Sequence, residues 1–463
     1  MFESFSLFDY MDEIKEKESV DLGQDSTQEQ TNKLMSDTTK EEIKKHEKHS
    51  KKLKSEPYDE EAIAKSGLSR SDYIRLNSYV GSRINTDFRK YSKKTSEEKG
   101  EKEMVSQKNV TNIEKVKENK GEEKDRLLII DGSSLLSTSF YATARELLFA
   151  KTDEQKEEAY TKLMQTKDGV YTNGFYMFFK TLLPMIEDNN ITHLAIVLDR
   201  SRQTTFRREL DPEYKANRKE TPAPLKSQFK LLTEMLPKMN IPVFSHEYYE
   251  ADDFAGSLCK KFENDIETIL HSKDEDYIQL VSDKSKLWMV TSKSEDMYKE
   301  LGLNRKDLKV PYGIFEYNPE YVKHFKGIEP IQIIDAKAIE GDKSDNIKGV
   351  KNVGETSSRP LLRHYGDLEG IYNAIEGLDA KEEKELAKFF KEELGIKRSP
   401  IKNMLLYKED ALLSKKLATI KTNIEEVQDL TLDDLKLDIN IEEMNKIFRE
   451  LEIKSLIKQK REH

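Results

Sequence analysis

The sequence predicts an α/β fold with a parallel sheet, followed by a helical region. Two observations support this prediction. Between about residues 126 and 290, short apolar runs of the kind that form buried strands alternate with longer segments of helical apolar spacing. From about residue 328 onward, only the helical spacing continues. Strands that alternate with helices form parallel sheets covered on both faces, so we expect such a sheet with an all-helical region packed on it.

The expected elements follow one another in a regular order. The strands are the apolar runs RLLIID, HLAIVLD, IPVF, ETIL and KLWMV, which begin at residues 126, 193, 241, 267 and 286. The helices between them are GFYMFFKTLLPMI, LKSQFKLLTEMLPKM and ADDFAGSLCKKF, which begin at residues 174, 225 and 251.

Residues 1–125 are expected to form a charged arm in front of this fold. Runs such as KEEIKKHEKHSKKLKSE carry both signs of charge and few apolar residues, so they bury little and should stay largely disordered. The stretch within residues 57–92 is more apolar and predicts one or two short helices of unassigned role. The expected organisation is therefore an arm over 1–125, an α/β domain over 126–325 and a helical region over 326–463.

Composition excludes some classes of protein but does not by itself predict a partner. The net charge of −10 is mildly acidic, yet carboxylates that hold divalent cations lose their negative charge locally, so nucleic-acid binding stays open. The single cysteine, Cys259, permits neither an internal disulfide nor a cysteine-based zinc site. The sequence has no run of about 18 apolar residues and no signal peptide, so we expect a cytoplasmic protein without a membrane span.

Acidic residues lie where the expected strands end, which is where open parallel sheets place their active sites. A lone aspartate there usually forms a turn or caps a helix, but here several such residues fall at the same expected edge. Three groups follow strands, a fourth begins a helix, and a further pair lies in EGDKSDN; together they are Asp131, Asp199, Glu250, Asp252, Asp253, Asp274, Asp276, Asp342 and Asp345.

A cluster of carboxylates predicts a metal site, because like charges repel strongly unless cations lie between them. Ligands that are all oxygen, without a cysteine or histidine pattern, favour Mg²⁺ or Mn²⁺ over zinc. Two such ions about 4 Å apart suit the in-line hydrolysis of a phosphodiester bond. The residues alone thus indicate phosphodiester chemistry without naming the polymer.

Five stretches of the sequence carry a family resemblance: IIDGSSLL, VLDRSRQTTFRRELDPEYKANRKETP, EYYEADDFAGSL, SKDEDYIQLVSD and AIEGDKSDNIKGVKNVGETSSRPLLRHYGDLEGIY. Their order and spacing resemble the 5′ nuclease family, which includes the exonuclease domain of bacterial DNA polymerase I, phage 5′ exonucleases and flap endonucleases. The resemblance implies a PIN-like nuclease domain and a stand-alone enzyme of replication or repair. Such an enzyme hydrolyses DNA from a 5′ end or at a 5′ flap. The resemblance also implies two or three Mg²⁺ or Mn²⁺ ions on the nine carboxylates, none of which is substituted.

Residues near 200–224 resemble the part of the family that forms a helical arch over the active site. The resemblance implies that a single-stranded 5′ end threads beneath this arch. Lys215 matches the catalytic lysine of the family, and we expect Arg207 to assist it and Arg218 to contact phosphate. Tyr214 is expected to stack on a base. Residues 145–165 resemble an insertion that adds a helix near the substrate entrance.

The stretch NIKGVKNVGETS resembles the helix–hairpin–helix of the family, expected near residues 346–365. There, backbone N–H groups contact the DNA duplex directly or through a bound K⁺, which implies contacts at Lys348, Gly349, Lys351 and Gly354. This hairpin departs from the family pattern, because Asn352 replaces a glycine and Thr356-Ser357 replaces Lys-Thr. Asparagine tolerates a positive φ, so the turn is expected to survive. Pro360 is expected in the first turn of the following helix.

The N-terminal peptide SFSLF, residues 4–8, resembles the motif by which bacterial replication proteins bind the sliding clamp. The alternative is a chance match. If the motif is real, Phe5, Leu7 and Phe8 would bind the clamp and the arm would tether a monomeric nuclease to DNA in a bacterial or phage-infected cell. Two other functions stay open from the residues: an RNA-directed PIN-type endoribonuclease, and a non-catalytic DNA-binding accessory protein.

Overall fold

The computed structural model describes residues 125–201 and 203–458. The predicted arm, the short helices expected within 57–92 and the clamp motif at 4–8 lie outside these described residues. Within the described part of the chain, no helix has the length and apolar character needed to cross a membrane.

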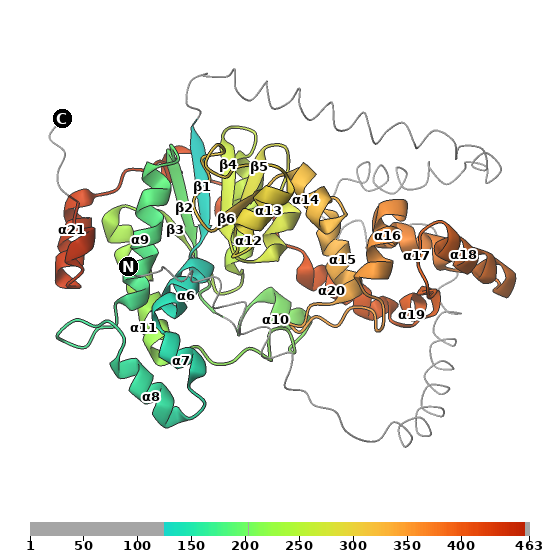
Figure 1. The fold of residues 1–463 in the computed structure, drawn as a ribbon, viewed down its shortest axis with the longest axis horizontal. Helices are drawn as coiled ribbons and strands as arrows, with labels where there is room; N and C mark the ends of the chain where they lie inside the picture. Colours follow the sequence, from blue (N-terminus) through green and yellow to red (C-terminus); the bar gives the residue numbers. More distant parts are fainter. Residues whose placement is uncertain (1–124, 202, 459–463) are drawn as a thin grey trace. The chain divides into compact units, whose positions relative to one another are not determined.

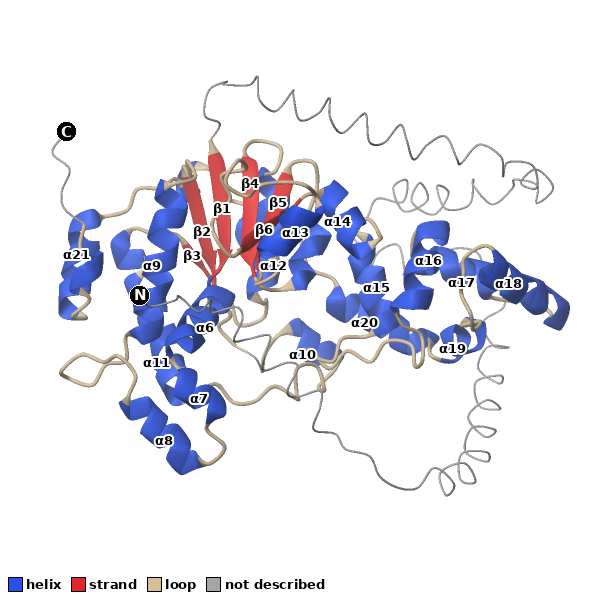
Figure 2. Ribbon diagram, in the orientation of Figure 1, coloured by secondary structure: helices blue, strands red, loops and turns tan. Residues whose placement is uncertain are grey.

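A six-stranded sheet forms the centre of the fold, in the order β3-β2-β1-β4-β5-β6 (Figure 2). The first five strands in the chain pair in parallel, and β6 pairs antiparallel with β5. The bounds are β1 (Arg126–Asp131), β2 (His193–Val197), β3 (Val243–Phe244), β4 (Glu267–Ser272), β5 (Ser285–Val290) and β6 (Ile314–Tyr317). The predicted parallel sheet is confirmed, and the four-residue edge strand β6 is an addition to it.

Helices cover both faces of the sheet, as expected for parallel strands (Figure 1). The helical elements up to β6 are α6 (Gly132–Thr143), α7 (Arg145–Phe149), α8 (Asp153–Thr161), α9 (Asn173–Glu187), α10 (Phe206–Leu210), α11 (Ala223–Met235), η1 (Pro237–Met239), α12 (Ala251–Phe262), η2 (Glu275–Leu280) and α13 (Ser294–Glu300). The insertion at 145–165 is thus helical, and its place at a substrate entrance stays a prediction.

Only helical and 3₁₀ elements follow β6 among the described residues, which confirms the predicted change of pattern. They are α14 (Pro319–Lys326), α15 (Gln332–Glu340), α16 (Glu355–Tyr365), α17 (Leu368–Ile375), α18 (Ala380–Glu392), α19 (Ile401–Leu406), α20 (Lys408–Ala418), η3 (Glu425–Val427), η4 (Asp433–Leu435), α21 (Ile441–Glu450) and η5 (Lys454–Leu456).

The alternation of side chains along β1 builds two cores, one on each face of the sheet. Leu127 and Ile129 belong to a core that includes residues of α12 and continues into the helical region as far as Leu435. Leu128 and Ile130 belong to the other core, which α6, α9 and α11 close. Because one core spans both regions, the helical region is packed directly on the sheet, as predicted.

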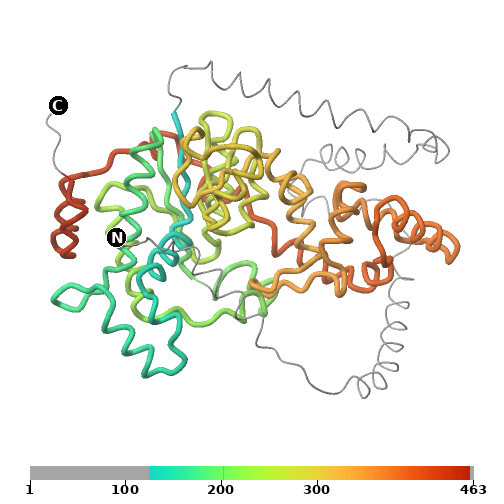
Figure 3. Tube along the Cα trace, in the orientation of Figure 1, coloured from blue at the N-terminus to red at the C-terminus, as the bar shows by residue number. Residues whose placement is uncertain are grey.

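The last described segment returns to the α/β part instead of remaining with the helical region. The Leu437 backbone N–H donates to the Thr192 carbonyl oxygen at 2.9 Å. On α21, the Phe448 ring lies 5.2 Å from the Phe179 ring of α9. Figure 3 shows this segment running back to the α9 side of the sheet. The end of the predicted helical region over 326–463 therefore packs on the α/β part of the structure.

Candidate metal centre

A cavity of about 1110 Å³ lies at the carboxyl edge of the sheet and is lined by residues of α6 and α10. We call it the carboxylate cavity. Cations line it as well, among them Lys215, Arg218 and Lys337. Six of the nine predicted carboxylates line it: Asp131, Asp199, Glu250, Asp252, Asp274 and Asp342. The topology explains the gathering, because parallel strands send their carboxyl ends to one edge.

Asp131 and Asp199 follow neighbouring strands, and short hydrogen bonds fix both side chains. Asp131 ends β1 and caps α6, accepting from the Ser134 backbone N–H at 2.8 Å. Its other oxygen accepts from the Ser272 hydroxyl at 2.9 Å. Asp199 accepts from the Ala251 backbone N–H at 3.0 Å, which joins the end of β2 to the start of α12. The two carboxylates therefore also have the capping role that single aspartates usually play.

The Lys337 ammonium group lies between two carboxylates, Asp276 after β4 and Asp342 after α15. Lys337 on α15 contacts the Asp276 carboxylate, and its Nζ lies 2.6 Å from the Asp342 carboxylate. The Ser344 backbone N–H and hydroxyl also donate to Asp342. Sequence reasoning missed Lys337; its position five residues before Asp342 was the available signal.

Arg207 is buried, contrary to the prediction that it assists at a phosphate. Its guanidinium pairs with both oxygens of Asp253, at 2.7 and 2.8 Å, and with Glu250 at 3.0 Å. It also donates to the carbonyl oxygens of Leu417 and Thr419. Only 1% of Arg207 is exposed, so in this structure it holds the fold together and does not face substrate. Asp253 is fully buried in the same contact and lies outside the cavity lining.

Tyr214 is also buried, which contradicts the predicted stacking on a base. Its hydroxyl donates to Glu250 at 3.0 Å and to Asp345 at 3.3 Å. The neighbouring Lys215 does reach the cavity, with Nζ 2.9 Å from Glu250 and 3.7 Å from Asp345. Arg218 pairs with Asp345 at 2.5 Å. Lys215 and Arg218 thus lie among the carboxylates, where the sequence placed them.

The segment expected to form a helical arch contains one short helix and a run of turns. Among its described residues, α10 ends at Leu210 and turns follow up to Asn217. The Lys215 backbone N–H donates to the Asp345 carbonyl oxygen at 2.9 Å, and the Asn346 amide donates to the Glu213 carbonyl oxygen at 2.7 Å. Lys215 itself has φ of +55°, a conformation that non-glycine residues adopt at a cost. The segment is therefore held against the loop that carries Asp342 and Asp345.

The carboxylates divide into two electrostatic groups. Burial, and then the charge of Asp199, raises the pKa of Asp131 to about 7. Burial also raises the pKa of Asp252, although Arg207 opposes this. By contrast Lys215 and Arg207 lower the pKa of Glu250 against the effect of burial, and Lys337 does the same for Asp342. Lysine and arginine side chains therefore offset the burial of Glu250 and Asp342. Nearby cations do not offset the burial of Asp131 and Asp252, so the pKa of each stays raised.

The donor set fits divalent cations. The Asp252 Oδ1 atom is buried and accepts no hydrogen bond among the described residues, and the nearest cation is the Arg207 guanidinium at 3.6 Å, so the atom retains capacity for a ligand. The lining offers oxygen donors of the type that Mg²⁺ and Mn²⁺ prefer. Within residues 125–201 and 203–458, however, no three acidic, histidine or cysteine side chains already converge as a ligand set. Instead, Lys215 is paired with Glu250, and Lys337 is paired with Asp276 and Asp342.

The hairpin, residues 346–354, keeps its predicted turn and differs elsewhere. Asn352 has φ of +63°, as expected for the residue that replaces glycine. Gly349 does not offer its N–H to a ligand, because it donates to the Ser414 hydroxyl at 3.1 Å. A Cβ at Gly349 would lie 2.3 Å from the Gly341 nitrogen, so close backbone packing requires this glycine. Lys348, Lys351 and Gly354 are exposed.

Two details around the hairpin were not foreseen. Pro360 lies inside α16, past its first turn, so Thr356 loses the N–H that would normally bond to its carbonyl oxygen. A cavity of about 860 Å³ separates the hairpin from the loop before α19, and Lys397 and Arg398 line it opposite Thr356 and Ser357. These two cations face the position where the family lysine is missing, and they are distant in sequence, so local reasoning could not find them.

Two family models match this chain in succession. The model described as "5'-3' exonuclease, N-terminal resolvase-like domain" matches residues 126–307. The model described as "5'-3' exonuclease, C-terminal SAM fold" matches residues 328–443. The order agrees with the α/β part and the helical part of the structure.

The chain is also similar to curated relatives and to a solved structure. A 5'-3' exonuclease of Halalkalibacterium halodurans is 33% identical over 313 residues, which is 67% of this chain and 88% of that protein. DNA polymerase I of Bacillus subtilis is 33% identical over 302 residues, 65% of this chain, and the match spans only 28% of the polymerase. A phage T5 5'-exonuclease with zinc bound is similar with a TM-score of 0.43 and 21% identity, covering 67% of this chain and 96% of that one.

Proposed function

We propose that this chain, which belongs to the 5′-3′ exonuclease family, hydrolyses DNA phosphodiester bonds from a 5′ end or at the base of a 5′ flap. Family membership rests on the 33% identity to a relative of which the match covers 88%. The structural observation that carries the proposal is the carboxylate cavity, which six of the nine predicted carboxylates line at the carboxyl edge of the sheet.

We infer that two or three Mg²⁺ or Mn²⁺ ions bind this cavity. Asp131 and Asp252 would hold them first, because burial leaves these carboxylates short of positive charge. Asp199 and Asp274 face the same cavity. Glu250, Asp276, Asp342 and Asp345 would join once their ammonium partners turn away. When bound, the metal would activate water and neutralise charge on the phosphate.

Lys215 is the cation best placed to stabilise the transition state. Its ammonium lies in the cavity between Glu250 and Asp345, which raise its pKa despite burial, so it is charged at neutral pH. After turning away from these carboxylates, the ammonium would still lie at the cavity and would lower the energy of the developing phosphorane charge. Arg218 lines the same cavity and would contact a neighbouring phosphate.

The hairpin would hold the duplex part of the substrate by its backbone. Lys348, Lys351 and the N-terminus of α16 at Gly354 are exposed and can reach phosphate directly, or through a K⁺ ion. Lys397 and Arg398 would supply charge that the hairpin has lost. These contacts carry no base information, so we expect binding without sequence preference.

A tether to the sliding clamp through Phe5, Leu7 and Phe8 stays a proposal from the sequence. It suits a monomeric enzyme in the cytoplasm of a bacterial or phage-infected cell. Deleting residues 1–10 should abolish clamp binding in a pull-down and leave nuclease activity unchanged. Clamp capture by the deleted chain would refute the tether.

One assay separates this function from its alternatives. The full chain is incubated with a 5′-flap DNA or an RNA of the same sequence, each with Mg²⁺ or with EDTA, and end-labelled products are sized. Mg²⁺-dependent cutting of the flap DNA alone supports the proposal. Preferred cutting of RNA would indicate an endoribonuclease, and DNA binding without cutting would indicate an accessory protein.

A further inference from the structure

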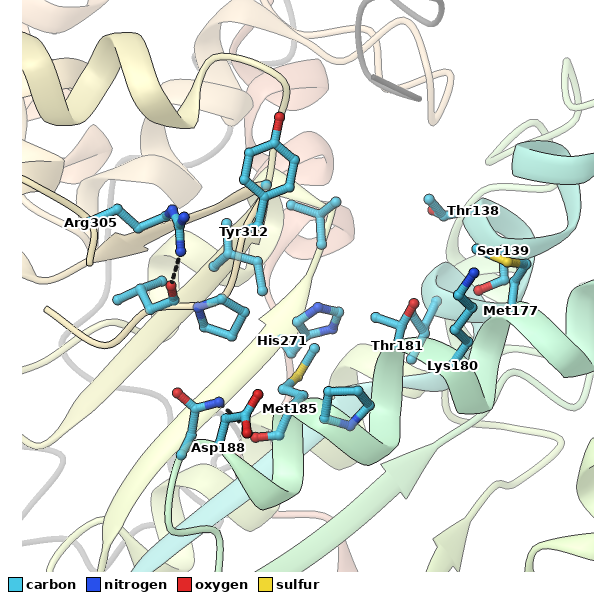
Figure 4. Close-up of a pocket in the computed structure, with 18 of the residues that line it drawn as sticks. Thr138, Ser139, Met177, Lys180, Thr181, Met185, Asp188, His271, Arg305 and Tyr312 are labelled. Atoms are coloured by element: carbon cyan, nitrogen blue, oxygen red, sulfur yellow. Dashed lines mark hydrogen bonds between the residues drawn. The ribbon is translucent and has the colours of Figure 1, made fainter. Parts of the chain in front are cut away.

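A second cavity, of about 790 Å³, lies between α6, α9 and the loop of residues 305–314 (Figure 4). We call it the α6–α9 pocket. Its volume falls in the range of about 300–1,000 Å³ that is usual for small-molecule sites. Ser134, in the first turn of α6, lines both this pocket and the carboxylate cavity. The two hollows are therefore neighbours at the start of α6.

A buried histidine without a partner lines this pocket. His271 on β4 is 2% exposed, and its Nδ1 has no hydrogen-bond partner among the described residues. Burial lowers its pKa to about 4, so the imidazole is neutral at physiological pH and presents one donor and one acceptor. An unpaired buried nitrogen is destabilising, and a polar group entering the pocket would remove that cost.

The rim of the pocket is basic and carries an aromatic ring. Tyr312 is 66% exposed, and the Arg305 guanidinium lies 5.5 Å from the centre of its ring. Lys180 of α9 and Lys306 and Lys309 of the loop add positive charge. Figure 4 shows His271 between Tyr312 on one side and Thr181 and Lys180 on the other.

These groups match the parts of a nucleotide. An exposed ring supported by a guanidinium can stack on a base, and ammonium groups around it can hold a phosphate. A neutral imidazole and the Thr181 hydroxyl can hydrogen-bond the edge of the base. An unpaired nucleotide fits better than a paired one, because only an unpaired base exposes both its face and its pairing edge.

We propose that the α6–α9 pocket binds one unpaired nucleotide of the DNA that occupies the carboxylate cavity. The proposal rests on the proposed function for the DNA, and on Ser134 for the continuity between the two sites. A nucleotide held there would fix the strand on the far side of α6 from the scissile bond. The pocket would then favour substrates with unpaired nucleotides near the cut.

Photo-crosslinking in EDTA tests this without depending on cleavage. Flap DNAs carry a single 5-iododeoxyuridine at successive unpaired positions of each strand, and the crosslinked peptide of the full chain is identified by mass spectrometry. We expect one position to crosslink to the 305–312 peptide, and Tyr312→Ala to remove the crosslink. Tyr312→Phe, which keeps the ring, should retain it.

Binding measurements in EDTA complete the test. Tyr312→Ala should weaken binding of DNA with unpaired nucleotides by about tenfold, as loss of one stacked base does, and leave a fully paired nicked duplex unaffected. If no position crosslinks to the loop, or if Tyr312→Ala weakens binding of both DNAs equally, the α6–α9 pocket is not a nucleotide site. Equal competition by free thymidine monophosphate would overturn its assignment to DNA. Asp274→Asn should keep the crosslink while losing cleavage, so this proposal and the nuclease proposal can fail separately.

Discussion

At the carboxylate cavity some of the acids are buried and paired with cations, whereas the lysines of the hairpin face solvent. Glu250 and Asp345 are each less than 10% exposed and contact Lys215, but Lys348 and Lys351 are exposed. Charge in a buried site is strongly felt, and exposed charge is screened by water and salt. We therefore expect substitutions in the cavity to alter the reaction rate or the stability of the fold. Substitutions on the hairpin should alter DNA affinity by small factors.

The largest expected effect comes from removing a cavity carboxylate. Asp274→Asn should lower the cleavage rate by about a thousandfold or more, because a metal supplies several kcal/mol of transition-state stabilisation. DNA affinity measured in EDTA should not fall. Asp296→Asn, an exposed change on α13, is the matched control. Full activity of Asp274→Asn would exclude the metal-cluster interpretation.

Breaking the buried ion pair of Arg207 should lower the free energy of unfolding more than it lowers the cleavage rate. Arg207→Ala leaves Asp253 buried without its guanidinium, a change that typically costs about 3–5 kcal/mol. The unfolding temperature should fall clearly, as measured by calorimetry. The adjacent Arg208→Ala removes a less buried guanidinium and should shift it much less. Equal shifts in the two variants would show that burial at Arg207 does not matter.

Lys215 should matter for rate more than for binding. Lys215→Ala should reduce the single-turnover rate by about a hundredfold, the usual result of removing one group that stabilises the transition state, with little change in DNA affinity. Lys219→Ala, in the same cavity lining, should reduce it much less. If both variants slow the reaction by the same factor, the lysine contributes only general charge.

Metal affinity of the cavity should depend on pH near neutrality. Because the pKa of Asp131 is raised to about 7, protons compete with the metal below that pH. Mn²⁺ affinity measured calorimetrically should therefore fall by about tenfold per pH unit as the pH drops below 7, and level off above it. Asp131→Asn should flatten this dependence. Equal affinity at pH 6 and pH 8 in the unaltered chain would contradict it.

The smallest effects are expected on the hairpin. Lys351→Ala or Lys397→Ala should weaken duplex binding a few-fold. Each should also reduce the slope of log affinity against log salt by about 0.9 for every phosphate that the protein no longer neutralises. The cleavage rate at saturating DNA should not change. A large fall in that rate would remove the distinction between the two regions.

The sequence could predict the sheet and the gathering of acids, since both follow from local patterns. β1, β2, β4 and β5 are apolar runs with polar ends, and parallel topology then brings Asp131, Asp199 and Asp274 to one edge. β6 was not predicted, because Glu316 interrupts its short apolar run IFEY.

The partners of the cations could not be predicted, because they depend on contacts between distant segments. Arg207 looks like a surface cation in TTFRREL, and only Leu417 and Thr419 show that it is buried. The sequence around Gly349 is typical of a phosphate-binding turn. In the structure, however, Gly349 packs against the Gly341 backbone and donates its N–H to the Ser414 hydroxyl. Burial of polar groups is decided by tertiary packing, which one sequence does not display.

The contacts of Arg207 also carry a consequence for the order in which the chain matures. The Arg207 guanidinium, next to Glu250 and Asp253, takes two of its acceptors from residues 417 and 419, more than 200 positions further along. On the ribosome, where N-terminal parts fold first, the acids could gather around the sheet long before these acceptors exist. The Arg207 contacts can form only after α20 has been synthesised. We therefore expect a nascent chain that stops before residue 417 to contain the acidic residues without the Arg207 contacts to residues 417 and 419.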